Sequence, residues 1–218
     1  MRVEWYGQSA FALSAPLGRV FIDPFADTSP LAERGIKFEY PAIEVEGVDL
    51  VLVTHEHVDH NGVEAIGGDP AVLRSTAGRL ESPFGEVLAV ASEHDDQAGT
   101  RRGPNTIFVF TLGEVRIAHF GDFGQRELRP EQRAAIGEVD LVFLPVGGGP
   151  TIGAEQAAAI APRWVVPMHY RTRRTDFLET AEEFLGLVGA VERLDTPGFD
   201  TADLPRNAGP LAIVPAAP

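Results

Sequence analysis

The stretch Thr54-His55-Glu56-His57-Val58-Asp59-His60 gathers four side chains of the kinds that bind metal ions. It follows an apolar run, Val48-Asp49-Leu50-Val51-Leu52-Val53, with the short, β-branched character of a buried strand. His55 and His57 are two residues apart, so in extended backbone their side chains point to the same side. Asp59 and His60 follow where the chain is predicted to turn into a helix over residues 61–66. Three of the six histidines in the chain lie in these seven residues.

This density of ligand-type side chains indicates a metal site. Imidazole and carboxylate groups suit zinc, and they also bind manganese or iron. The alternative is a polar loop in which Asp59 caps the following helix. Capping uses one of the four side chains and leaves the histidines unexplained, so metal binding is the favoured interpretation.

Three further ligand-type side chains follow later predicted strands. His94 comes after the strand predicted at 87–90, Asp122 after the one at 115–118, and His169 after the one at 163–168. His119 is expected to be a core or supporting residue and not a ligand. The remaining strands are predicted at 2–6, 11–13, 19–22, 71–73, 107–111 and 139–146, with a helix over 154–161.

The motif His55-x-His57-x-Asp59-His60 after an apolar strand resembles the signature of the metallo-β-lactamase superfamily. Within it, the chain looks most similar to the cytoplasmic zinc-dependent hydrolases that include the ascorbate-6-phosphate lactonase-like proteins. The other stretches that carry this similarity are Ile22-Asp23-Pro24-Phe25, His119-x-Gly121-Asp122, Leu144-Pro145-x-Gly147-Gly148 and Pro167-x-His169-Tyr170. The similarity extends from about residue 1 to residue 175.

The resemblance implies an α/β fold, an αββα sandwich of four layers with mixed sheets and outer helices, formed by residues 1–218 as a single domain. It places the metal site at one edge of the two sheets. It also implies a ligand set, in which one ion is bound by His55, His57 and His94, the second by Asp59, His60 and His169, and Asp122 bridges the two. Three histidines with an open position are typical of a catalytic zinc site and not of a structural one.

Two such cations, roughly 3.5–4 Å apart, would share a hydroxide that is nucleophilic at neutral pH. Asp59 would orient this hydroxide or shuttle its proton. The predicted function is therefore that of a metal-dependent hydrolase acting on a small ester, lactone or phosphodiester. Fold alone does not identify the substrate.

For some residues near the predicted ligands, a role in the site is implied only by the resemblance. Asp23 is expected to support the ligands from behind by fixing imidazole tautomers, with a simple turn before Pro24 as the alternative. Tyr170 and Arg171 occupy positions that commonly face the substrate, where Arg171 would pair with a phosphate or carboxylate. A solvated surface arginine is the alternative. Gln8 departs from the pattern, because related sequences often have Gly-His-Ser at this place.

Four other segments carry weaker signals. Residues 26–47 have little periodicity and are predicted to form a long loop, a candidate flap over the active site. The triple glycine at 147–149 is interpreted as a turn, with an anion cradle as the alternative. Residues 175–189 show a helical apolar stripe that is assigned to the core. Residues 211–214 are predicted to add an edge strand.

The composition narrows the class of partner. The chain has 218 residues, with 18 Lys and Arg against 32 Asp and Glu, so its formal charge is −14. This charge disfavours nucleic acid and anionic membranes and favours a small-molecule substrate. Cysteine is absent, which excludes thiolate ligands and disulfides. The residues after Met1 do not resemble a signal peptide, so the cytoplasm is the expected location. The oligomeric state is left open, a homo-oligomer included.

Two alternatives of different kinds remain. A di-iron redox protein of the same fold would typically have an acidic residue in place of His57 and a flavin-binding domain, and neither is found in this sequence. A non-catalytic metal-binding protein would need no complete ligand set. A hydrolase with two divalent ions, zinc before manganese or iron, is the favoured function.

Overall fold

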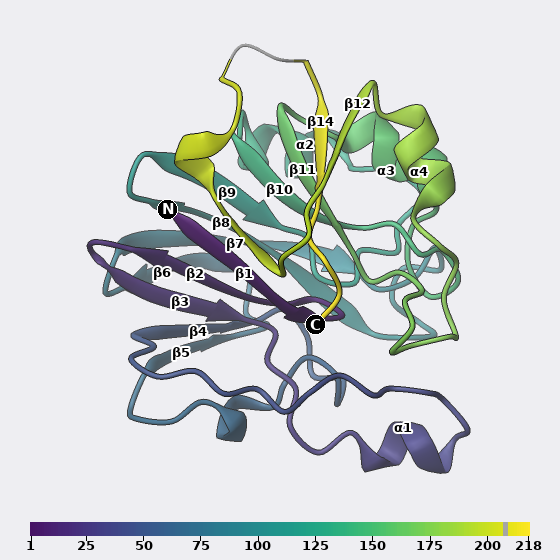
Figure 1. Ribbon diagram of the computed structural model, residues 1–218, viewed down its shortest axis with the longest axis horizontal. Helices are drawn as coiled ribbons and strands as arrows, with labels where there is room; N and C mark the ends of the chain where they lie inside the picture. Colours follow the sequence, from purple (N-terminus) through teal and green to yellow (C-terminus); the bar gives the residue numbers. More distant parts are fainter. Residues whose placement is uncertain (207–208) are drawn as a thin grey trace.

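Two mixed β-sheets packed face to face form the body of the protein (Figure 1). The computed structural model describes residues 1–206 and 209–218. In spatial order, the first sheet contains β13 (Gly198–Asp200), β1 (Arg2–Gly7), β2 (Ala10–Ala15), β3 (Gly18–Ile22), β4 (Leu50–Val53) and β5 (Ala71–Arg74). Its strands are antiparallel from β13 to β3 and parallel from β3 to β5. The predicted mixed-sheet sandwich is therefore confirmed.

The second sheet is larger. In spatial order it contains β12 (Ala190–Arg193), β14 (Leu211–Val214), β11 (Trp164–Met168), β10 (Leu141–Pro145), β9 (Val115–His119), β8 (Pro104–Leu112), β7 (Gly85–Glu93) and β6 (Gly78–Ser82). The strands from β12 to β9 are parallel, and those from β9 to β6 are antiparallel. All residues of β10 and β11 are buried, as expected for parallel strands covered on both faces.

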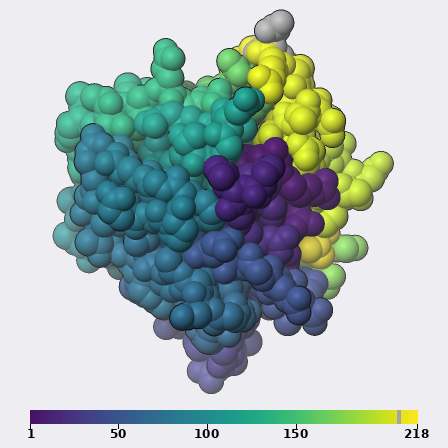
Figure 2. Space-filling model, turned by 90° about the vertical axis from the view of Figure 1, so that its left-hand side faces the viewer, coloured from purple at the N-terminus to yellow at the C-terminus, as the bar shows by residue number. Residues whose placement is uncertain are grey.

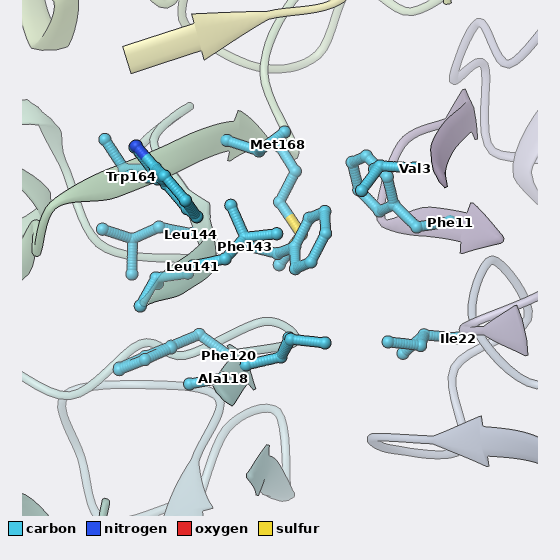
Figure 3. Close-up of a cluster of buried hydrophobic side chains, with 14 of the residues drawn as sticks. Val3, Phe11, Ile22, Ala118, Phe120, Leu141, Phe143, Leu144, Trp164 and Met168 are labelled. Atoms are coloured by element: carbon cyan, nitrogen blue, oxygen red, sulfur yellow. The ribbon is translucent and has the colours of Figure 1, made fainter. Parts of the chain in front are cut away.

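The inner faces of the two sheets meet in an apolar core (Figure 3). Val3, Phe11 and Ile22 of the first sheet face Phe143 and Met168 of the second. The rings of Phe11 and Phe143 have centroids 4.5 Å apart, and Phe11 is fully buried. This contact fixes the spacing of the sheets whose ends carry the site.

The two outer layers differ from each other. The second sheet is covered by α2 (Pro130–Ile136), α3 (Ala154–Ile160) and α4 (Glu182–Leu187). The outer face of the first sheet is covered mainly by the loops before and after β4, which contain α1 (Ser29–Glu33) and a 3₁₀ turn (Val63–Ala65). Phe25, Tyr40 and Ile66 from this segment pack on that face. In the described residues, no helix has the length and apolar composition needed to cross a membrane.

The C-terminal segment joins both sheets. β13 pairs with β1, so this part of the chain lies beside the N-terminal strand (Figure 2). β14 pairs with β11 on one side and β12 on the other. The prediction of an edge strand at 211–214 was therefore wrong about the edge, because β12 covers it.

Several elements differ from those predicted. The helix expected over 61–66 is a single 3₁₀ turn, and the helix expected over 175–189 is shortened to α4. The apolar stripe still buries Leu178, Phe184 and Leu185, so its assignment to the core holds for these residues. The short elements α1, α2, β6, β12 and β13 were not predicted, and α1 lies within the segment 26–47 that was predicted as a long loop. The three strands are held by pairing with neighbouring strands, and α2 is held by packing on the core through Ile136; local periodicity reports neither.

We predict that Phe11→Ala lowers the free energy of unfolding by about 3–5 kcal/mol, because it leaves a cavity between the sheets. Urea denaturation would measure this loss. Leu17 is 69% exposed, so Leu17→Ala should change the stability by no more than about 0.5 kcal/mol. An equal, small effect of both substitutions would contradict the assignment of Phe11 to the core.

Candidate metal centre

Four chain segments bring the predicted ligands to one edge of the sandwich. The stretch 54–60 follows β4, and His94, Asp122 and His169 follow β7, β9 and β11. Strand ends suit this task because packed strands hold positions rigidly. His57 is the most exposed of the histidines, and the other predicted ligands are buried. All seven predicted ligands are brought together: His55, His57, Asp59, His60, His94, Asp122 and His169.

Their ligand atoms form three overlapping groups. Within each group, one atom from each residue lies within 4.8 Å of the others. The groups are His55, His57 and His94; His55, His60 and Asp122; and Asp59, His60 and His169. The first and third groups are the two triads implied by the family resemblance.

Asp122 lies between the two triads. Its Oδ2 is 3.1 Å from Nε2 of His94 and 3.0 Å from Nε2 of His169. The same oxygen is 3.9 Å from Nε2 of His55, and Oδ1 is 3.4 Å from Nε2 of His60. One carboxylate thus faces histidines of both groups, as a bridging ligand would.

Buried polar atoms without hydrogen bonds show that a cation fits these residues. Nε2 of His55, Nε2 of His60 and Oδ1 of Asp122 are all buried, and the described residues provide no hydrogen-bond partner for them. A buried polar atom left without a partner costs about 1–3 kcal/mol. Imidazole nitrogens and carboxylate oxygens are ligands for divalent transition metals. A bound cation would satisfy all three atoms.

Burial and neighbouring charge shift the pKa values of the centre in different directions. Burial lowers the pKa of His55 well below its usual value, and the neighbouring His60 adds to this effect. Burial and His94 likewise lower the pKa of His57. These two imidazoles are therefore neutral near pH 7, and neutral imidazole is the form that binds a metal.

The shifts of His60 and Asp122 favour their charged forms. Burial opposes the charge of His60, but Asp122, Asp59 and Asp23 raise its pKa well above the usual value. Burial also opposes the charge of Asp122, but His169, His60 and His94 lower its pKa well below the usual value. The Asp122 carboxylate is therefore ionised and available to cations.

Asp23 supports the centre from behind, in agreement with its expected place. Its Oδ2 is 2.9 Å from Nδ1 of His60 and accepts a hydrogen bond of 2.8 Å from Oγ1 of Thr54. Its Oδ1 accepts a hydrogen bond from the backbone N–H of Thr54 at 2.8 Å. Because a carboxylate accepts the proton at Nδ1, a bound cation would displace the proton at Nε2, and the Nε2 lone pair of His60 would then face the centre.

Other histidines are oriented in the same way. Nδ1 of His94 is 3.1 Å from the carbonyl oxygen of Pro150, and Nδ1 of His55 is 3.0 Å from Oγ1 of Thr54. Both contacts leave Nε2 directed at Asp122. His119 is buried at the back of the centre, where Nε2 donates to the carbonyl of Ser9 at 3.1 Å. His119 was expected to be a core or supporting residue, and its buried position agrees with this expectation.

Sequence reasoning missed Asn105, which positions Asp122. Its Oδ1 accepts the backbone N–H of Asp122 at 3.0 Å, and its Nδ2 donates to the carbonyl of Phe120 at 2.8 Å. Gly121 lies between them with a φ of 54°, and a Cβ there would come within 2.6 Å of Oγ1 of Thr54. No sequence signal distinguishes this asparagine from others, whereas the glycine before Asp122 belongs to the motif.

Gln8 contacts the centre in place of the commonly seen histidine. Its Nε2 donates to Oδ2 of Asp59 at 3.4 Å, and its side chain is fully buried. Its backbone carbonyl accepts the N–H of His169 at 3.4 Å. Gln8 therefore touches two predicted ligands, and it is more than a polar loop residue.

A cavity of about 950 Å³ opens onto the centre and is lined by His57, Asp59, His94, Asp122 and His169. The loop expected to act as a flap contributes Pro30, Leu31, Arg34 and Ile36 to its wall. Phe177, assigned from sequence to the core stripe, is half-buried and lines this cavity instead. The reason is that residues 175–181 form an irregular stretch with bends and no helix.

Tyr170 and Arg171, predicted to face the substrate, do not line this cavity. Tyr170 is buried against Trp5 with ring centroids 5.7 Å apart, and burial raises its pKa. Nε of Arg171 donates to the carbonyl of Leu178 at 2.6 Å. Their substrate-binding role therefore stays a prediction from the resemblance alone.

The glycine run at 147–149 is a turn, in agreement with the favoured interpretation. The N–H of Gly147 donates to the carbonyl of His169 at 3.0 Å, and the N–H of Gly148 donates to the carbonyl of Ile152 at 3.2 Å. Gly148 and Gly149 have φ values of 57° and 60°, which favour glycine. Two of the three amides are thus used within the protein and do not point at an anion.

Comparison with known proteins agrees with this fold and centre. The family model for the β-lactamase superfamily domain matches residues 2–169. The chain therefore belongs to the β-lactamase superfamily, as its motifs predicted.

Relatives extend this assignment. A protein of Methylobacterium nodulans named UPF0173 metal-dependent hydrolase is 32% identical, covering 78% of this chain and 85% of the relative. One of the same name from Thermococcus kodakarensis is 30% identical, covering 87% and 92%. A crystal structure from Thermotoga maritima, assigned as a zinc-dependent hydrolase of the metallo-β-lactamase superfamily, has 26% identity and a TM-score of 0.77, with 99% of each chain covered. These names agree with the predicted class, a metal-dependent enzyme.

Burial lowers the pKa of His119 to about 4, against an opposing effect of Asp23. The unfolded chain binds this proton at its ordinary pKa of about 6.5. Because the folded state binds the proton more weakly, stability is retained above about pH 6.5 and lost as the pH falls toward 4. We predict that the free energy of unfolding falls by about 3 kcal/mol more in the wild type than in His119→Gln over this range.

Urea denaturation of chelator-treated protein at several pH values would measure this difference, without a contribution from metal release. Above pH 7 the two stability curves should run parallel. Parallel curves down to pH 4 would show that His119 does not stay neutral in the folded protein.

Proposed function

We propose that this protein is a metal-dependent hydrolase with a two-ion centre that acts on a small ester, lactone or phosphodiester. The observation that carries the proposal is the position of Asp122, whose two oxygens face histidines of two separate triads. A carboxylate with two oxygens is suited to join two cations. A structural zinc site would instead use four ligands around one ion and leave no open position.

The residues that would hold the ions are those of the two triads, with Asp122 between them. Two divalent ions, zinc first and manganese or iron as alternatives, would supply a nucleophilic water at neutral pH and polarise the substrate oxygen. The chain's own task is to keep the ligand atoms in place. Thr54, Asp23 and Pro150 do this by holding Nδ1 of His55, His60 and His94, so that each Nε2 lone pair stays directed at the centre.

Asp59 is the residue we assign to proton transfer. It lies on the cavity wall, and its Oδ2 faces Nε2 of Gln8 at 3.4 Å and Nε2 of His60 at 3.6 Å. The described residues provide no hydrogen bond to its Oδ1. This oxygen is therefore the one that would orient the attacking water and accept its proton.

The cavity supports a small substrate. Its volume of about 950 Å³ matches the size range of small-molecule sites, and Leu31, Ile36 and Phe177 provide apolar surface beside the polar centre. The net charge of −14 makes nucleic acid an unfavourable partner. The proposal therefore keeps a small molecule as the substrate.

We predict that the zinc-loaded protein hydrolyses at least one of three probes: 4-nitrophenyl butyrate, dihydrocoumarin or bis(4-nitrophenyl) phosphate. Chelation should remove this activity and added zinc should restore it. Asp59→Asn should lower kcat by about 10²–10⁴-fold, the usual contribution of a positioned acid or base. Because the amide keeps an oxygen donor, elemental analysis should show that this variant still binds metal.

Asp69→Asn is the matched control, since Asp69 is exposed and does not line the cavity. It should leave kcat unchanged. If the metal-loaded protein hydrolysed none of the probes, the hydrolase proposal would fail. If it hydrolysed one of them and Asp59→Asn kept the wild-type kcat, the role assigned to Asp59 would fail. Two bound irons with oxygen-dependent chemistry would instead support the redox alternative.

A further inference from the structure

Four arginines line the cavity above the metal centre, in a protein where acidic residues outnumber basic ones. They are Arg34 of the flap segment, Arg101 and Arg102 from the connection between β7 and β8, and Arg126. The same wall carries five carboxylates: Glu56, Asp59, Asp95, Asp96 and Asp122. Which of these charges are already neutralised decides what the cavity can bind.

Four of these carboxylates are paired with other side chains or belong to the metal centre. Glu56 accepts hydrogen bonds from Arg74 at 2.7 Å and Ser75 at 2.6 Å, both outside the cavity wall. Asp96 pairs with Arg126 at 3.3 Å. Asp59 and Asp122 belong to the metal centre. None of these four groups is therefore available to the other rim arginines.

Asp95 is engaged by backbone and not by a cation. Its Oδ2 accepts the backbone N–H groups of Arg101 at 3.0 Å and Arg102 at 2.8 Å. Its Oδ1 accepts those of Gln97 at 2.8 Å and Gly99 at 2.9 Å. Asp95 follows the predicted ligand His94 directly, so this network ties the backbone of the two arginines to the metal centre.

On the cavity wall, three guanidinium groups have no partner among the described residues. Within residues 1–206 and 209–218, the side chains of Arg34, Arg101 and Arg102 have neither an ion pair nor a hydrogen bond, while Arg126 is paired with Asp96. A guanidinium offers five donors and recognises carboxylate and phosphate groups in a fixed geometry. The three residues are exposed, so an anion in the cavity can reach them.

We propose that Arg101 and Arg102, assisted by Arg34, bind an anionic group of the substrate, a carboxylate or a phosphate monoester, that lies apart from the bond to be cleaved. This inference rests on the proposed function, because it takes the metal centre to be the place of cleavage. In this proposal the substrate is recognised by the arginines on the cavity wall and not by Arg171, whose side chain is hydrogen-bonded to the carbonyl of Leu178. The substrate class becomes a small ester or lactone with an added negative charge.

The test uses two pairs of probes that differ only by a carboxylate in place of a methyl group. The first pair, N-phenylsuccinamic acid and N-phenylbutanamide, is for binding, measured by calorimetry on zinc-loaded and on chelator-treated protein. The second pair, the mono-4-nitrophenyl ester of succinic acid and 4-nitrophenyl butyrate, is for hydrolysis. Chelator-treated protein removes any attraction between the carboxylate and the ions, so it reports the arginines alone.

Wild-type protein is expected to bind the acid about tenfold more tightly than the neutral amide, since two or three exposed charge pairs contribute about that factor. Arg101→Gln/Arg102→Gln should reduce the ratio to near one, and Arg34→Gln should reduce it partly. The Asp95 network should persist in the double variant because it uses only backbone N–H groups. High salt should reduce the wild-type ratio in the same way.

The matched control is Arg79→Gln/Arg193→Gln, which removes the same charge from exposed arginines paired with Glu86 and Glu182, away from the cavity. It should keep the wild-type ratio. Equal binding of acid and amide by the wild type, or an unchanged ratio in Arg101→Gln/Arg102→Gln, would overturn the proposal. The proposal would also be overturned if the control variant lowered the ratio as much as Arg101→Gln/Arg102→Gln does, because the preference for the acid would then depend only on the net charge of the protein.

The hydrolysis pair separates this inference from the proposed function. Turnover of both esters at equal rates, without preference for the acid in binding, would leave the hydrolase standing and remove the arginine site. Discrimination in binding without hydrolysis of either ester would support the arginine site and count against the ester as substrate. A lower KM for the charged ester than for the neutral one, with a similar kcat for the two esters, would support both the hydrolase function and the arginine site.

Discussion

A single buried carboxylate, Asp122, is surrounded by imidazoles from three separate parts of the chain, and the rest of the site depends on it. The residue is only 3% exposed, and His55, His60, His94 and His169 all direct Nε2 at it. Without a cation, Nε2 of His55, Nε2 of His60 and Oδ1 of Asp122 have no hydrogen-bond partner within the part of the chain that the structure describes. Such a cluster is stable only if positive charge is added or if folding energy elsewhere holds it together. The packed core of the sandwich supplies the folding energy. Bound metal ions would supply the positive charge.

Backbone conformation shows how firmly the fold holds these groups. Gln8, Asp23 and His169 all have φ near 50°, a conformation that side chains other than glycine rarely adopt. Each such residue costs roughly 1–3 kcal/mol and persists only where the surrounding structure imposes it. All three touch the centre or its supporting hydrogen bonds. The strain is offset by the packed sheets, such as the Phe11–Phe143 contact behind the site.

Sequence reasoning located the centre because its predicted ligands are rare residue types at strand ends. His55, His57 and His60 stand out by spacing, and the family motif placed His94, Asp122 and His169 beside them. It missed Asn105, Arg101 and Arg102, which are common residue types whose meaning depends on what lies near them in space. It also overextended the helix at 175–189, because the apolar residues there are buried partly in an irregular stretch and partly in α4. The order of the strands in the two sheets was not predicted, because the spacing of apolar residues carries no information about which strands pair.

The measurement that tests this account most directly is the metal content of the purified protein, determined by elemental analysis with and without Asp122→Ala. The account predicts close to two divalent ions per chain in the wild type, and a clear loss in the variant, because both triads face the same carboxylate. A circular dichroism spectrum like that of the wild type would show that the variant still folds. A wild-type protein that is free of metal and takes up no added zinc, manganese or iron would contradict the central claim.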